Sequence, residues 1–196
     1  MSLDWTPPTL ETDRLILRPV TPADATAVFL YASNPAVTRF TLFETHQTVD
    51  DARWFVNDYV RSRYANREPD PFGIVLKADP LKTVVGSIGA RWASQQNGVM
   101  ELGFSLAEPY WGRGLVAEAA RAVIGFVFAE FAVERLQAQV FVGNDASERV
   151  FQKLGFTREG ILRSFVLRRG RWWDVAMYSQ LSDEFNSGPP TPNRLA

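Results

Sequence analysis

Two glycines flank one arginine in Tyr110-Trp111-Gly112-Arg113-Gly114, directly before a long helical pattern of apolar residues. Glycine permits positive φ and close approach of the backbone to a ligand, because it has no side chain. The first amides of a helix lack partners within the helix, and the helix dipole adds positive potential there. This combination is typical of a site for an anionic group, most often phosphate. The sequence therefore predicts a phosphorylated small-molecule ligand at this loop.

Other phosphate motifs fit less well. A P-loop requires Gly-x-x-x-x-Gly-Lys followed by Ser or Thr, which no segment of the chain matches, so nucleotide hydrolysis is not expected. A dinucleotide fingerprint stays open, because Gly112, Gly114 and Ala117 fit Gly-x-Gly-x-x-Ala. Two observations count against it. The motif follows a loop (107–111) instead of a strand, and the next strand ends in Val142-Gly143-Asn144, without an acid for ribose hydroxyls.

The composition limits the remaining chemistry. The 196 residues are 46% hydrophobic and 22% charged, as expected for one soluble domain with a sizeable core. There is no cysteine and a single histidine, His46, expected to be an exposed loop residue, so no metal site is expected. The net charge of -1 gives no general attraction to nucleic acid. With neither an apolar membrane-length run nor a signal-peptide pattern in view, we expect a cytoplasmic protein without membrane or nucleic-acid partners.

Hydrophobic periodicity and capping signals predict the elements that position the loop. Strands are expected at 14–18, 72–78, 84–92, 99–106, 135–142, 156–167 and 172–181. Helices are expected at 21–33, 48–63, 115–131 and 144–154, the first two with Thr/Asp capping pairs. This order indicates an α/β fold with a mixed, mostly antiparallel sheet. One parallel, right-handed crossover joins 99–106 to 135–142, and the glycine loop lies at its carboxyl end, where ligands bind.

Four segments, in this order and spacing, resemble the GNAT family of N-acetyltransferases and, within it, the ribosomal-protein alanine acetyltransferases of the RimJ/RimL type. They are Leu10–Arg18 (LETDRLILR), Glu101–Leu106 (ELGFSL), Tyr110–Gly114 (YWGRG) with Glu118-Ala119, and Asn144–Ser147 (NDAS) followed by Lys153–Phe156 (KLGF). The ending Trp172–Ser179 is also similar. The resemblance covers residues 10–181, which predicts a single domain over 1–185 and a disordered tail over 186–196, rich in Pro, Ser and Asn.

The resemblance implies the GNAT acyl-CoA N-acyltransferase fold and transfer of acetyl from acetyl-CoA to a primary amine by direct attack. The subgroup points to a protein N-terminus as acceptor, such as that of a ribosomal protein. A small-molecule amine (antibiotic, polyamine or amino acid) remains the alternative, as does a non-catalytic acyl-CoA sensor, because one fold serves many functions. Both a monomer and a homodimer remain open.

The resemblance also implies cofactor-binding residues. The pyrophosphate loop of the family maps onto Trp111–Val116, where Trp111 and Val116 depart from the usual residue types. Backbone amides make the contacts, so the path of the chain matters more than the side chains. The full expected set is Phe104, Ser105, Leu106, Trp111, Gly112, Arg113, Gly114, Leu115, Val116, Asn144, Ser147 and Phe151.

Two residues are candidates for proton transfer. An amine is mostly protonated at neutral pH and must lose a proton before it attacks. Glu101, on the strand that leads to the loop, is the candidate base; the alternative is a glutamate that faces solvent or pairs with Arg91. Ser147 is the candidate acid for the thiolate, since Phe151 stands where many relatives have a tyrosine. A serine in a first helical turn can instead only cap the backbone.

Acceptor recognition is expected from aromatic and acidic residues. The candidates are Phe40, Trp92, Glu101, Trp172 and Asp174. Since Trp172 and Trp173 are adjacent on a strand, at most one of them enters the pocket. The hairpin also carries five arginines, expected to form a solvated tip instead of a nucleic-acid site: Arg158, Arg163, Arg168, Arg169 and Arg171.

Overall fold

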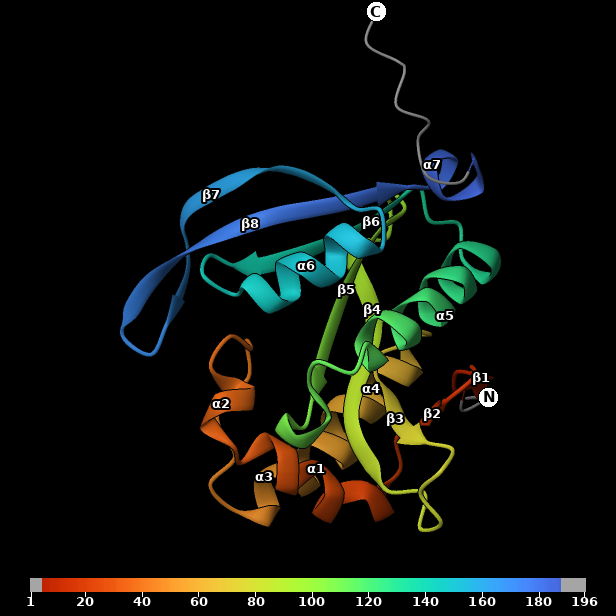
Figure 1. Cartoon of the computed structure of the whole chain (residues 1–196), viewed down its shortest axis with the longest axis vertical. Coiled ribbons are helices and arrows are strands. Elements are labelled where there is room, and N and C mark those ends of the chain that lie inside the picture. The colour runs from red at the N-terminus through yellow and green to blue at the C-terminus, as the bar shows by residue number, and fades with distance from the viewer. Residues whose placement is uncertain (1–4, 188–196) are drawn as a thin grey trace, which may run out of the picture.

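A mixed sheet of eight strands runs through residues 5–187, the part of the chain that this computed structural model describes (Figure 1). The spatial order is β1-β2-β3-β4-β5-β6-β8-β7. The strands are β1 (Leu10–Glu11), β2 (Leu15–Pro19), β3 (Phe72–Leu76), β4 (Val84–Ser94), β5 (Val99–Leu106), β6 (Arg135–Phe141), β7 (Thr157–Arg168) and β8 (Arg171–Leu181). Each predicted strand is present, and the short edge strand β1 was not predicted.

The strands β5 and β6 form the one parallel pair among the described strands, and all the other pairs are antiparallel. Their register covers only Val99 with Arg135, Met100 with Leu136 and Glu101 with Gln137. Beyond Glu101 the two strands continue without pairing. The predicted mixed sheet and its single parallel crossover are therefore confirmed, and the crossover strands separate towards their carboxyl ends.

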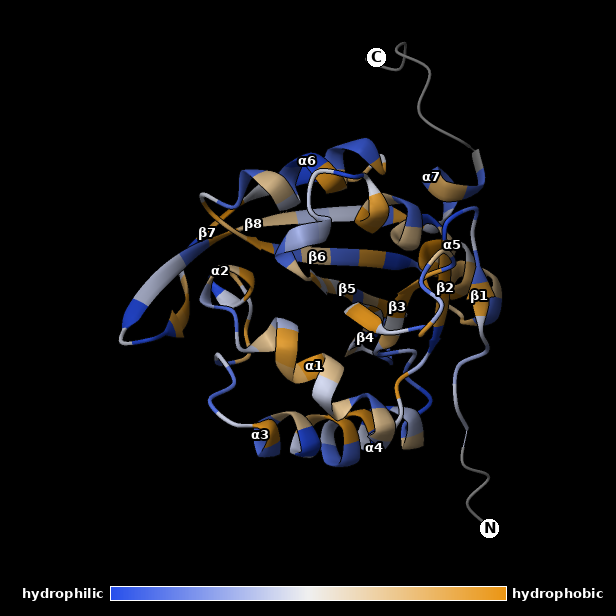
Figure 2. Ribbon diagram, turned by 60° about the horizontal axis from the view of Figure 1, so that its bottom comes forward, coloured by the Kyte–Doolittle hydropathy of each residue, from blue (hydrophilic) through white to orange (hydrophobic). Residues whose placement is uncertain are grey.

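Helices cover both faces of the sheet (Figure 2). Adjacent residues of a strand point to opposite faces, so Ile74 joins one core and Val75 the other. The first core lies against α5 (Leu115–Glu130) and α6 (Asp145–Lys153). The second core lies against α1 (Ala25–Ala32), α3 (Val49–Trp54) and α4 (Val60–Ala65). The glycine loop precedes α5, so the first face is the one on which we expect the cofactor.

The capping predictions hold at two helix starts. Thr21 and Asp24 form a capping box, as do Thr48 and Asp51. The first helix begins with a 3-10 turn (Pro22–Asp24), and the second is interrupted by a π-turn (Phe55–Tyr59) between α3 and α4. Such insertions are frequent at functional sites because they change the direction of side chains within a helix. Here the rings of Phe55 and Tyr59 stack with centroids 5.3 Å apart.

The β7–β8 hairpin extends beyond the rest of the sheet and reaches the region of the short helix α2 (Pro35–Thr38) (Figure 1). Its tip is not the solvated arginine cluster that the sequence suggested. Arg168 is only 5% exposed and donates hydrogen bonds to the carbonyls of Arg39 and Phe43. Arg169 pairs with Glu44 at 3.0 Å. The tip is therefore fastened to the segment 39–45, whereas Arg158, Arg163 and Arg171 are exposed.

The chain end differs from the expectation in one respect. A last helix, α7 (Ser182–Ser187), contains the first two residues of the segment expected to be a tail. The rest of that segment, 188–196, lies outside the described residues. In the described part of the chain no helix combines the length and apolar character needed to cross a membrane.

Candidate active site

The glycine loop has the backbone conformation that anion binding requires. Gly112 and Gly114 adopt φ values of 72° and 74°, and Gly114 is the N-cap of α5. A Cβ added at Gly112 would meet no atom of residues 5–187 within 4 Å, so this part of the chain leaves the loop open to a ligand. The indole Nε1 of Trp111 donates to the carbonyl of Leu106 at 2.7 Å, which ties the loop to the end of β5. Successive amides of such a turn form a concave site for phosphate oxygens.

A second set of contacts holds the start of α5. The Glu118 carboxylate accepts hydrogen bonds from the Thr12 hydroxyl (2.6 Å) and from the backbone and guanidinium of Arg14 (2.9 and 2.6 Å). Arg14 also donates to the carbonyl of Arg113 in the loop. Burial opposes ionisation of Glu118, but the hydrogen bonds from Thr12 and Arg14 outweigh it and lower the pKa of this carboxyl. Two of the segments on which the resemblance rests therefore brace each other.

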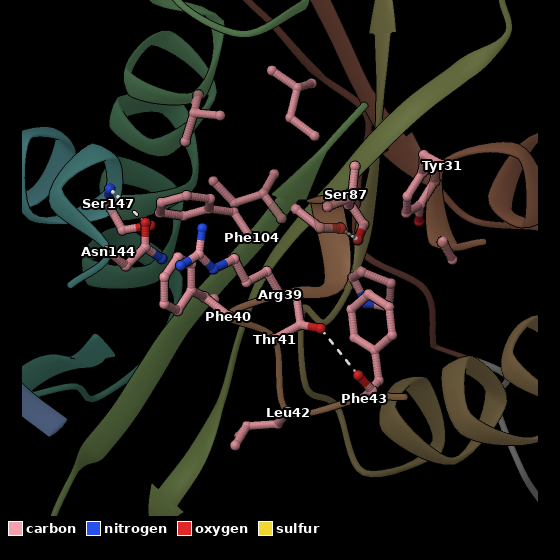
Figure 3. A pocket seen from close by; sticks show the side chains of 18 of the residues that line it. Tyr31, Arg39, Phe40, Thr41, Leu42, Phe43, Ser87, Phe104, Asn144 and Ser147 are labelled. Carbon is pink, nitrogen blue, oxygen red and sulfur yellow. Dashed lines mark hydrogen bonds between the residues drawn. The ribbon is translucent and has the colours of Figure 1, made fainter. Parts of the chain in front are cut away.

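One cavity of about 1450 Å³ connects the loop with the opposite face of the sheet. Its lining includes residues of both separated strands, Leu102–Leu106 of β5 and Gln139–Phe141 of β6. Figure 3 shows Asn144 and Ser147 on one side of this cavity, Tyr31 and Ser87 on the other, and the segment Arg39–Phe43 between them. A ligand held at the loop can therefore reach through the sheet between β5 and β6.

Glu101 occupies the point where β5 and β6 separate. It is 8% exposed and lines the cavity. One carboxylate oxygen pairs with Arg91 Nη2 at 2.5 Å, and the other accepts from Gln139 Nε2 at 2.8 Å and Gln137 Nε2 at 3.4 Å. The sequence left two alternatives to a role of Glu101 as a base. The structure shows one of them, the pairing with Arg91, and Glu101 does not face solvent. Both oxygens are hydrogen-bonded, so the side chain is fixed in place.

The expected cofactor residues lie along the first part of the cavity. Asn144 caps α6 and accepts a hydrogen bond from the Ser147 amide at 3.3 Å, which leaves the serine hydroxyl available. The Phe104 and Phe151 rings contact each other with centroids 5.6 Å apart. Of the twelve residues expected there, eleven line the cavity: Phe104, Ser105, Leu106, Trp111, Gly112, Gly114, Leu115, Val116, Asn144, Ser147 and Phe151. The exception is Arg113, whose guanidinium lies over the Tyr110 ring, 5.5 Å from its centroid.

The expected acceptor residues are divided. Phe40 lines the cavity and makes an edge contact with Trp173. Trp92 does not line it, because this side chain packs against Phe131 in the core on the cofactor face. Trp172 is 59% exposed on the hairpin and also lies outside the cavity. Asp174 accepts a hydrogen bond from the Ser164 amide at a bulge of the same hairpin, which is a structural contact away from the cavity.

The cavity contains three groups that the sequence did not identify. Tyr59, Arg63 and Asp70 lie with Arg91 on the part of the cavity beyond Glu101 (the acceptor side), although they come from the π-turn, α4, a loop and β4. No short motif joins them, so only the fold could bring them together. His46 also lines the cavity and is half-buried beside Phe43 and Phe55, contrary to the expected exposed position; burial lowers its pKa.

The residues present fit a coenzyme A donor. The anion site at the start of α5, the opening between β5 and β6 and a polar acceptor side form one continuous cavity. A diphosphate suits the open amides of the loop, and an extended thiol arm suits the channel along β5. The dinucleotide alternative finds no acidic side chain at the carboxyl end of β6, where Phe141 is followed by Val142 and Gly143.

Comparisons with known proteins agree with this geometry. The family model described as an acetyltransferase (GNAT) domain matches residues 14–157. The N-acetyltransferase YoaA of Bacillus subtilis is 33% identical over 172 residues, which cover 88% of this chain and 96% of that protein. The [ribosomal protein uS5]-alanine N-acetyltransferase of Escherichia coli is more distant, with 26% identity over 62% of this chain and 58% of its own length.

Solved structures share the architecture. A GNAT-family acetyltransferase from Bacillus anthracis superposes with a TM-score of 0.79 and 26% identity, covering 90% of this chain and all of that one. The acetyltransferase MccE, solved with acetyl-CoA and AMP, has the same TM-score at 18% identity and supports the fold alone; its alignment covers 91% of this chain and 99% of that one. The chain therefore belongs to the GNAT family of N-acetyltransferases, which use acetyl-CoA as the acyl donor.

Proposed function

We propose that this acetyltransferase modifies the α-amino group of a protein N-terminus, in the manner of the RimJ/RimL-type enzymes. The observation that carries the proposal is the continuous cavity between the cofactor loop and the polar acceptor side. The distant similarity to the uS5-alanine enzyme supports this acceptor class over others. An extended N-terminus has the shape to enter such a channel with its amine first.

In this proposal Glu101 faces the acceptor at the opening of the sheet. A buried carboxylate attracts an ammonium group, and its contacts with Arg91 and Gln139 keep it in one orientation. Acetyl-CoA supplies an activated thioester when bound. The fixed side chains around the opening align the amine with that carbonyl, so much of the acceleration comes from positioning.

Ser147 is proposed to assist departure of the thiolate. It lies in the first turn of α6 and lines the same cavity, and its amide is already satisfied by Asn144. Its hydroxyl can donate a proton or a hydrogen bond to sulfur. The positive end of the α6 dipole adds to the stabilisation of an anion at this position.

A small-molecule amine is the second candidate. It is favoured by the contact between the hairpin tip and the segment 39–45, because Arg168 and Arg169 hold the segment that carries Phe40 and Phe43 against the acceptor side. A fixed aromatic wall suits a compact acceptor with an apolar body.

The test compares acceptors directly. Purified enzyme and acetyl-CoA would be incubated with N-terminal peptides, the same peptides with a blocked α-amine, and a panel of amino acids, polyamines and aminoglycosides. Thiol release gives the rate, and mass spectrometry locates the acetyl group. We expect turnover with free N-terminal peptides and none with the blocked ones. Turnover confined to small amines would favour the second candidate, and binding of acetyl-CoA without any turnover would indicate a sensor.

A further inference from the structure

A pair of glycines on neighbouring strands lies below the acceptor side (the Gly89–Gly103 floor); Gly103 lines the cavity, and Gly89 is buried beneath Asp70. The register of β4 and β5 places Gly89 opposite Gly103, between the pairs Arg91–Glu101 and Ser87–Ser105. Residues two apart share a face, so these three pairs lie side by side on one face of the sheet. Gly103 is exposed within this central strand, and a Cβ added there would meet no atom of the described part of the chain within 4 Å. Open space therefore lies above Gly103, next to Glu101.

Asp70 stands over the other glycine of this pair. A Cβ at Gly89 would come within 2.6 Å of both the Cα and the Oδ1 of Asp70, so glycine is required for this approach. The segment before Asp70 runs along β4, where Ala90 donates its amide to Pro69 and Trp92 donates its amide to Glu68. The Asp70 carboxylate and the Glu101 carboxylate thus flank the open floor from two sides.

The charges around this floor are unequal. Three carboxylates and two guanidiniums meet there. Arg63 pairs with Glu68 at 2.9 Å, and Arg91 pairs with Glu101. Within residues 5–187, no cation lies within ion-pair distance of Asp70. An acceptor ammonium would supply the missing positive charge.

Among the described residues, one group donates a hydrogen bond to the Asp70 carboxylate. The Tyr59 hydroxyl donates to its Oδ2 at 2.8 Å. Burial raises the pKa of Asp70, while the hydrogen bond from Tyr59 and the charges of Arg91 and Arg63 oppose the rise and Glu68 adds to it. The pKa of Tyr59 is itself raised to about 12, mainly by burial and by Asp70, so this hydroxyl keeps its proton at neutral pH. A carboxyl in this setting is suited to receive a proton.

We propose that Asp70, oriented by Tyr59 over the Gly89–Gly103 floor, binds the acceptor ammonium and takes the proton that must leave before attack. This inference rests on the proposed amine acetylation and holds for a peptide or a small acceptor alike. Glu101 then positions the acceptor through its fixed contacts instead of accepting that proton.

The proton balance is complete. The ammonium gives one proton to Asp70 and becomes a neutral amine with a free electron pair. That pair forms the C–N bond with the acetyl carbonyl carbon while the C–S bond breaks and its electrons stay on sulfur. The nitrogen loses a second proton, which the departing sulfur takes up to leave as the thiol. Asp70 finally returns its proton to solvent, so no additional reactant is needed.

The pH dependence of kcat/KM separates the two carboxylates. Activity falls with decreasing pH as the base becomes protonated, which gives an acid limb in the profile. We expect Asp70→Asn to lower kcat/KM by at least about 100-fold and to abolish the limb. Tyr59→Phe removes the hydrogen bond that stabilises the charged form of Asp70, so the pKa of Asp70 rises and the acid limb moves to higher pH. Glu101→Gln lowers the rate but keeps the limb, and Asp58→Asn, an exposed neighbour on the π-turn, serves as the unaffected control.

A second readout does not depend on turnover. Infrared difference spectra recorded during pH titration of the apo-protein report the C=O stretch of protonated carboxyl groups. We expect a signal from a buried carboxyl group that is absent in Asp70→Asn and displaced in Tyr59→Phe. Circular dichroism and calorimetric affinity for acetyl-CoA would verify that the variants are folded. Should Asp70→Asn fail to fold, Tyr59→Phe carries the test in both measurements.

Defined results would overturn the inference. An acid limb that persists in Asp70→Asn would exclude Asp70 as the base, and one that disappears in Glu101→Gln alone would assign the base to Glu101. An infrared titration identical in the wild type and Asp70→Asn would also refute it. Absence of turnover with every amine would count against the proposed function instead, while the infrared result would still decide the protonation of Asp70.

Discussion

Glu118 holds Arg14 across 104 positions of the sequence, with the Arg14 Nε 2.6 Å from one carboxylate oxygen. The contact braces the first turn of α5, whose amides belong to the predicted anion site. We expect Glu118→Gln to weaken acetyl-CoA binding about fivefold, equivalent to about 1 kcal/mol, because the pair is partly exposed. Calorimetry measures this, with Asp50→Asn, which breaks the exposed Asp50–Arg53 pair, as the control. An effect on acceptor KM alone would contradict a bracing role.

The two loop glycines give the second prediction. Gly112 and Gly114 have positive φ, a conformation that β-branched residues rarely adopt. We expect Gly112→Val and Gly114→Val to abolish calorimetrically detectable acetyl-CoA binding, since the new side chains strain the loop and occupy the phosphate path. Gly160→Val is the control, because Gly160 is not among the positive-φ glycines and has open space around it. Equal affinities in all three variants would disprove the assignment of this loop.

Ser147 gives the third prediction. Ser147→Ala keeps the amide that Asn144 caps and removes only the hydroxyl. We expect kcat to fall about 10-fold, less than the roughly 100-fold or more that is typical of a full proton donor, while the affinity for acetyl-CoA is preserved. Substrates with leaving thiols of different acidity reveal the role, because the loss should shrink as the thiol becomes more acidic. A loss of kcat that does not depend on the acidity of the leaving thiol would indicate that Ser147 only caps the helix.

The hairpin tip gives the fourth prediction. Arg169 pairs with Glu44 and also donates to Thr45 at 2.8 Å, which fixes the wall that bears Phe40 and Phe43. We expect Arg169→Ala to raise the acceptor KM severalfold while acetyl-CoA affinity stays unchanged, because the wall lies on the acceptor side. Arg163→Ala, on the exposed part of the same hairpin, is the matched control. Steady-state kinetics with the acceptor varied would decide, and a change in cofactor affinity would argue for a broader role of the tip.

The ion pair between β6 and β7 gives a pH-dependent prediction. Both terminal guanidinium nitrogens of Arg135, Nη1 and Nη2, lie 2.6 Å from Glu159 oxygens. These hydrogen bonds, opposed by slight burial and aided by Ser179, lower the Glu159 pKa to about 2. A carboxyl with a depressed folded-state pKa stabilises the fold fully above its ordinary value of 4.5, and this contribution is lost as pH falls from 4.5 towards 2.

Thermal unfolding followed between pH 6 and pH 2 tests it. At pH 6 the Tm of Glu159→Gln should lie below that of the wild type, and at pH 2 the two Tm values should be similar. The Tm of the variant therefore depends less on pH than the Tm of the wild type. Glu130→Gln, at the exposed end of α5, should keep the wild-type slope. Parallel curves for the wild type and Glu159→Gln would contradict the assigned pKa.

The sequence by itself predicted the main strands and helices and indicated the glycine loop as the place of an anion site. Capping pairs at Thr21 and Thr48 and the glycines of the loop act locally, within one or two helical turns, so their consequences can be read along the chain. The anion-binding character predicted for residues 111–116 is local for the same reason, because these residues are contiguous in the sequence. Only local interactions were needed for these predictions.

The tertiary structure decided the acceptor side. Trp92 and Asp174 had plausible residue types, but core packing and a hairpin bulge engage them elsewhere. Asp70 carried no signal in the sequence, because its environment comes from Tyr59, Gly89 and Arg91 on separate elements. Burial and charge at a site depend on contacts between distant segments, and these form only when the sheet and its helices are assembled.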